Sequence, residues 1–103
     1  MSHAHPINSQ QRRWLRQQAH HLKPVVLLGQ AGLTDSVLNE IELALDHHEL
    51  IKVRVNGGDH DERDAQVAAI AEHTTADLVQ RIGNVAVYFR ANPKRKDAIV
   101  LPV

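Results

Sequence analysis

The order in which helix-like and strand-like patterns alternate is the feature that most restricts the fold of this chain. Apolar residues recur at helical spacing in residues 9–21, 34–48 and 61–74, and strand-like runs occupy residues 25–28, 49–55, 78–82 and 85–90. Strands separated by helices require crossovers that lay those helices on the sheet. Gly83-Asn84 predicts a hairpin that adds one antiparallel strand. We therefore expect an α/β fold, a two-layer sandwich in α-β-α-β-α-β-β order with a mixed four-stranded sheet.

A single domain accounts for all 103 residues. Ser9 and Thr34 are the expected N-caps of the first and second helices, because their hydroxyl oxygens can accept from the first backbone N–H groups. Residues 1–8 and 91–103 show neither periodicity and are expected to be flexible or loosely packed.

The first two predicted strands differ in pattern. Residues 25–28 are a continuous apolar run, which predicts a strand buried on both faces. Residues 49–55 alternate instead, so one face is apolar and the other carries Lys52 and Arg54. This second strand therefore has a basic face, although the Lys52 stem could equally pack along the sheet.

Charge is balanced in total but not along the chain. Lys plus Arg number 12 and Asp plus Glu number 12, which by itself disfavours a nucleic-acid-binding protein. Residues 1–30 hold four basic and no acidic residues, whereas residues 31–50 hold five acidic and no basic residues. The second and third helices are acidic, and the first helix, the strands and the tail are basic. If the basic elements converge, one face of a neutral molecule carries a positive field.

The loop at residues 29–32 joins a strand to the start of a helix. Its two glycines let the backbone approach a ligand, and the helix start offers N–H donors and a positive dipole end to a phosphate. Two glycines alone are explained at least as well by an ordinary strand-to-helix turn as by a phosphate-binding loop. The loop lacks the Lys-Ser/Thr pair of a nucleotide-binding P-loop and the third glycine of the dinucleotide fingerprint.

Residue types argue against several other classes of protein. The chain has no cysteine, and its eight histidines lack the H-E-x-x-H spacing of a zinc site. Its three serines show no nucleophile pattern. We therefore expect no catalytic residues, no metal and no cofactor. No apolar run is long enough to span a membrane and no secretory signal is evident, so we expect a cytoplasmic protein.

Two longer runs, residues 19–34 (AHHLKPVVLLGQAGLT) and 47–53 (HHELIKV), together resemble the CRM domain in its stand-alone bacterial form, the YhbY family. Phe89-Arg90 is similar to the Tyr-Arg that ends the family's last strand. The resemblance implies a fold like the C-terminal domain of translation initiation factor three. It also implies RNA binding through a GxxG loop like that of KH domains, here Gly29 to Gly32, and association with precursors of the large ribosomal subunit.

Together, the charge pattern and the resemblance predict a monomer that binds ribosomal RNA. The predicted RNA-binding residues come from the loop, the first helix, the strands and the tail: Gly29, Gln30, Ala31, Gly32 and Thr34; Arg12, Arg13, Arg16, His20 and Lys23; Lys52, Arg54 and Arg90; Lys94, Arg95 and Lys96. Two alternatives stay open. One is a protein-interaction adaptor that uses the acidic helices on ribosomal particles. The other is a small metal-dependent enzyme, which would need several histidines to converge.

Overall fold

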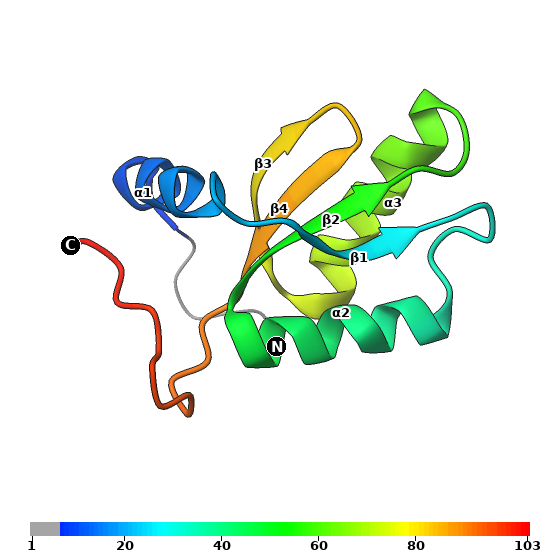
Figure 1. Cartoon of the computed structure of the whole chain (residues 1–103). Helices are drawn as coiled ribbons and strands as arrows, with labels where there is room; N and C mark the ends of the chain where they lie inside the picture. Colours follow the sequence, from blue (N-terminus) through cyan, green and yellow to red (C-terminus); the bar gives the residue numbers. More distant parts are fainter. Residues whose placement is uncertain (1–6) are drawn as a thin grey trace.

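The computed structural model describes residues 7–103 and contains the predicted elements in the predicted order (Figure 1). The elements are α1 (Ser9–Ala19), β1 (Pro24–Leu28), α2 (Asp35–His48), β2 (Leu50–Val55), α3 (His60–Thr74), β3 (Asp77–Ile82) and β4 (Val85–Phe89). The sheet order is β1-β2-β4-β3, with β1 parallel to β2 and the other two pairs antiparallel. The α/β class and the mixed four-stranded sheet are thus confirmed.

The helix starts follow side-chain capping. Thr34 caps α2 as expected, since its Oγ1 accepts from the backbone N–H of Val37 at 3.2 Å. Asn8, and not Ser9, caps α1. The Asn8 side chain accepts from the Gln11 N–H at 2.8 Å, and the Gln11 side chain accepts from the Asn8 N–H at 3.1 Å. The prediction of Ser9 was wrong because the residue before it completes this reciprocal pair.

Helices α2 and α3 cover one face of the sheet. Ile41 and Leu45 of α2 and Ile70 of α3 are fully buried in a core with the inward side chains of β1, β2 and β4. Tyr88 is fully buried there as well, and its hydroxyl donates to the carbonyl of Val67 at 2.7 Å. Burial raises the pKa of this hydroxyl far above its ordinary value. These two layers are the predicted sandwich.

Helix α1 lies on the other face and covers only part of it (Figure 1). Leu15 and Ala19 pack on Val79, Val87 and neighbouring residues in a second, smaller core. The irregular C-terminal segment adds its own apolar side chains to this core: Ile99 and Leu101. The fold is therefore a two-layer sandwich with a partial third layer.

The partial layer overturns one sequence prediction. Residues 25–28 were expected to be buried on both faces, yet the side chains of Val25 and Leu27 are 51% and 59% exposed. β1 is an edge strand, and α1 lies mainly over β2, β3 and β4. Of the β1 residues, Val26 and Leu28 face the main core. The result is an open apolar surface beside the basic positions of β2.

The C-terminal segment is tied to the fold by Glu49. Its carboxylate is buried and accepts from the backbone N–H of Asn92 at 2.7 Å, from that of Ile99 at 2.8 Å, and from the Arg95 guanidinium at 2.6 Å. Residues 91–103 form no helix or strand. The mobility expected for them stays a prediction. Most of the other end predicted to be flexible, residues 1–6, lies outside the described residues.

Candidate nucleic-acid interface

The loop at residues 29–32 projects from the end of the parallel strand pair. It is a tight turn, because the Gly32 N–H donates to the Gly29 carbonyl at 3.0 Å. Gly29 is exposed, and a Cβ built on it would meet nothing within 4 Å. Gly32 differs, since its φ of +73° disfavours other residues and a Cβ there would lie 2.9 Å from the Gln66 amide nitrogen. The loop is open to a ligand at its first glycine and packed at its second.

A second loop supports the first. The Asn56 N–H donates to the Leu28 carbonyl at 3.1 Å, which extends the pairing of β1 and β2 beyond the strands. A Cβ on Gly57 would lie only 2.3 Å from the Gly29 carbonyl oxygen. Gly57 thus lets the two backbones touch and holds the 29–32 loop in place. Gly57 is not among the residues predicted from the sequence; its signal is a glycine in the turn after the strand that pairs with β1, two residues beyond the end of that strand.

The start of α2 lies at the end of this loop and suits an anion better than the start of α3. The first turn of α2 holds one acidic residue, Asp35. That of α3 holds Asp61 and Glu62, in addition to the capping carboxylate of Asp59. Carboxylates at a helix start already satisfy its dipole and repel phosphate. The Thr34 hydroxyl is engaged in capping the helix, so a phosphate there would meet backbone N–H groups.

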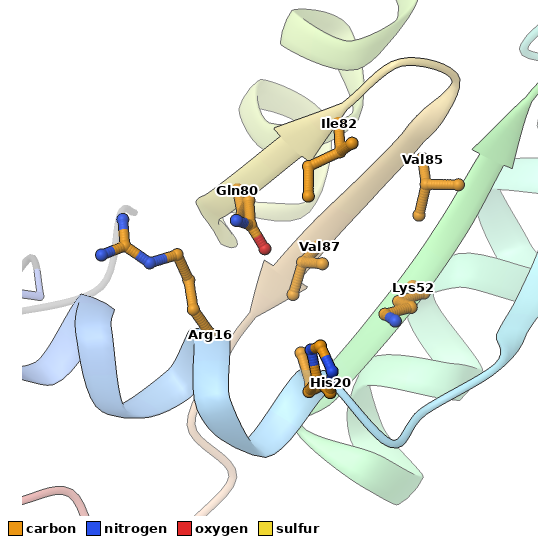
Figure 2. Close-up of a pocket in the computed structure, with 8 residues that line it drawn as sticks. Arg16, His20, Lys52, Gln80, Ile82, Val85 and Val87 are labelled. Atoms are coloured by element: carbon orange, nitrogen blue, oxygen red, sulfur yellow. The ribbon is translucent and has the colours of Figure 1, made fainter.

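Basic side chains line the open sheet face between α1 and this loop. Lys52 and Arg54 project from β2 on the side that α1 partly covers, and Arg54 pairs with Leu27, two residues before the loop. Arg16 of α1 and His20, the C-cap of that helix, border a hollow of about 240 Å³ together with Lys52 (Figure 2). Arg13, one turn earlier on α1, is exposed.

Acidic side chains gather on the opposite layer. Within residues 7–103, the carboxylates of α2 and α3 belong to the helices that cover the other face of the sheet. The predicted segregation holds on the open face, whereas Arg81, Arg90 and Arg95 pair with carboxylates of or next to the acidic helices. A phosphate approaching the open face meets the cations first.

Two predicted arginines are already engaged within the fold. The Arg12 guanidinium donates to the β3 carbonyls of Leu78 and Val79. The Arg90 guanidinium pairs with Glu42 at 2.7 Å and Asp46 at 2.9 Å. It also donates to the Thr74 carbonyl at 2.8 Å. Both arginines join structural elements, so the interface proposed below does not include them.

The predicted tail cations lie apart from the loop. Arg95 is paired with buried Glu49, and Lys94 and Lys96 are exposed on the same irregular segment. Lys23 is exposed between α1 and β1, where it lines a separate hollow together with Arg95. The structure therefore places Arg54 nearest the loop and Lys52 further back along β2. Arg13, Arg16 and His20 belong to the α1 end of the open face, which lies away from the loop (Figure 1).

One group in the described part of the chain has the donor types of a cation site. His60, Asp61 and Asp64 bring their ligand atoms within 4.8 Å of one another at the exposed start of α3. Asp64, however, is bonded to the Arg81 guanidinium. This bond holds the pKa of the Asp64 carboxyl below its ordinary value. A cation would compete with a guanidinium already in place. Over residues 7–103, none of the helices is both long and apolar enough to cross a bilayer.

The fold and the site together define a class, a small α/β domain with a GxxG loop at the end of a parallel strand pair and a basic sheet face beside it. A family model for the CRS1/YhbY (CRM) domain matches residues 7–90. The chain belongs to this family.

Individual relatives agree with this assignment. A protein of Haemophilus influenzae named "RNA-binding protein" is 47% identical over 96 residues, which are 93% of this chain and 95% of the relative. Bacillus subtilis "Probable RNA-binding protein YqeI" is 34% identical over 96 residues, 93% of this chain and 99% of the relative. The solution structure of a hypothetical Staphylococcus aureus protein matches with a TM-score of 0.79 at 32% identity, covering 94% of this chain and all of that one.

Proposed function

We propose that this chain is a non-catalytic RNA-binding protein that associates with the RNA of precursor large ribosomal subunits during assembly, as a cytoplasmic monomer. The observation that carries the proposal is a series of cations along the open sheet face, with Arg54 nearest the 29–32 loop, Lys52 further back on β2 and Arg16 on α1, and with the acidic helices on the opposite layer. The names of the two bacterial relatives support RNA as the ligand. The family resemblance supports the ribosomal role.

Binding is expected to run mainly through the phosphate backbone. A phosphate docks on the exposed backbone at Gly29 and the start of α2, and neighbouring phosphates pair with the cations of the open face. About four to six such contacts release counterions and give a slope of roughly −3 to −5 in a plot of log affinity against log salt. An affinity that does not change with salt would contradict this mechanism.

Gly29→Asp tests the loop directly. The position has room for a side chain, so the fold is expected to persist, while the new carboxylate repels the phosphate. RNA affinity is expected to fall about tenfold, and the salt slope to become shallower by about 1, the loss of one phosphate contact. Fluorescence anisotropy with protein-free ribosomal RNA over a salt series measures both quantities.

Gly29→Ala is the matched control, because it adds a side chain without charge in the same open space. Its affinity should stay close to that of the wild type, and thermal melts of both variants should match it. If folded Gly29→Asp binds RNA as tightly as the wild type, the loop is not the phosphate site.

The same protein-free ribosomal RNA distinguishes the adaptor alternative from RNA binding. It keeps one observation in its favour, the 60% exposed Leu43 on acidic α2, which offers an apolar contact to a protein. A protein that binds precursor particles but not their RNA after deproteinisation would be an adaptor. An RNA-binding protein retains the deproteinised RNA.

A further inference from the structure

The hollow between α1 and the uncovered sheet has the walls of a small binding pocket (Figure 2). Val85 and Val87 of β4 form an apolar floor, Ile82 lies at the β3 side, and the Gln80 amide is an uncharged polar group on β3. Its volume of about 240 Å³ is below the roughly 300–1,000 Å³ of pockets for drug-sized ligands, which suits a single small ring system.

The rim of the hollow is cationic. Arg16 lies on α1, His20 is the C-cap of that helix and Lys52 lies on β2. None of the residues that line the hollow carries a carboxylate. The His20 imidazole ring is a surface on which an RNA base can stack. The Arg16 guanidinium points away from the other lining side chains (Figure 2) and is free to contact a phosphate at the rim. The Lys52 ammonium is a donor for a phosphate. The lining therefore combines an apolar floor, one stacking plane and an amide that can bond the polar edge of a base.

We propose that this hollow receives one unpaired base of the bound RNA, while the phosphates on either side of that nucleotide contact the rim. The inference rests on the proposed function, since it assumes that RNA lies on this face. A base in a duplex is stacked and paired and cannot enter, so the occupant comes from a bulge, a loop or a single strand. The charge of the rim favours a polyanion over a peptide.

This inference also changes the expected mode of recognition. The chain has few aromatic residues, and base stacking on a ring platform is not expected from its composition. The hollow replaces such a platform with a single ring, the imidazole of His20.

The test compares two RNA probes of the same stem sequence, one fully paired and one with a single unpaired nucleotide. For the wild type, we expect the bulged probe to bind at least about fivefold more tightly, the low end of one base-stacking contact. Val85→Phe fills the hollow and should bring the ratio of the two affinities close to one. Gln80→Leu removes the amide with little change in volume and should also lower the ratio, and it replaces Val85→Phe if that variant does not fold.

Leu27→Phe is the control, because it enlarges an exposed side chain of the same sheet face outside the hollow. It should keep the wild-type ratio. A wild type that binds both probes equally, or a folded Val85→Phe and Gln80→Leu that both keep the full preference, overturns the base pocket and leaves RNA binding intact. A wild type that binds neither probe contradicts the proposed function itself.

Discussion

Replacing Glu49 with alanine is expected to lower the free energy of unfolding by about 3–5 kcal/mol, the usual cost of removing one partner of a buried ion pair. The Glu49 carboxylate accepts from two backbone N–H groups and from Arg95. Alanine leaves the two backbone N–H groups without this acceptor. Arg95, whose side chain is 24% exposed, keeps a charge with no carboxylate partner and only the His48 carbonyl at 3.4 Å. Urea or thermal unfolding measures the loss.

The same change is expected to release the C-terminal segment. Ile99 and Leu101 pack beside α1 in the second core, and Glu49 holds the chain that carries them. Limited proteolysis should therefore cut within residues 91–103 of Glu49→Ala faster than in the wild type. A loss of less than about 1 kcal/mol, the worth of an exposed pair, would mean that the segment is not held by this carboxylate.

Glu49→Gly distinguishes the effect of the lost carboxylate on stability from the effect of backbone strain at this position. Glu49 has a φ of +64°, which costs a residue with a Cβ but not glycine. Glycine removes the same carboxylate and relieves that strain, so it should be more stable than Glu49→Ala by about 1 kcal/mol. If the two variants are equally stable, the backbone at residue 49 stores no strain.

Gly57→Ala is expected to cost about 1–3 kcal/mol and to displace the 29–32 loop. Its Cβ would lie 2.3 Å from the Gly29 carbonyl oxygen and 3.5 Å from the Cα of Gln30. Both neighbours are backbone atoms, so no side chain can turn aside. One of the two loops must move, and RNA affinity should fall with it if the loop is the phosphate site. Denaturant unfolding and RNA titration of the folded variant measure the two effects.

Gly29→Ala is again the matched control, because the same methyl group there meets no atom within 4 Å. Its unfolding free energy should stay within about 0.5 kcal/mol of the wild type. If Gly57→Ala is equally harmless in both measurements, the loops are not in the close contact that the structure shows.

Most of the secondary structure was predictable because it depends on local periodicity. The alternation at residues 49–55 assigned Lys52 and Arg54 to one face and Ile51, Val53 and Val55 to the other, and the structure confirms both faces. A β-strand turns successive side chains to opposite sides whatever lies around it. The order of the elements and the mixed sheet follow from the same patterns, and so do the separate acidic and basic segments.

The candidate site was predictable only in part. The sequence identifies the 29–32 loop but not Gly57, whose role depends on a neighbouring strand reached through a whole helix. It identifies arginines but not their partners. Arg12 and Arg90 were predicted to bind RNA, and the structure shows that each bonds groups far away in the chain. A basic residue has the same local pattern whether its partner is a phosphate or a carboxylate of the same protein.

By itself, the sequence determined the elements, their order, the side of each strand that is apolar and the acidity of α2 and α3. Only the tertiary structure decided how much of each sheet face is covered. Since β1 is an edge strand and α1 covers only part of the second face, Val25 and Leu27 are exposed and a hollow lies beside Lys52. Coverage of a face depends on contacts between distant segments, and the local pattern of a strand does not record them.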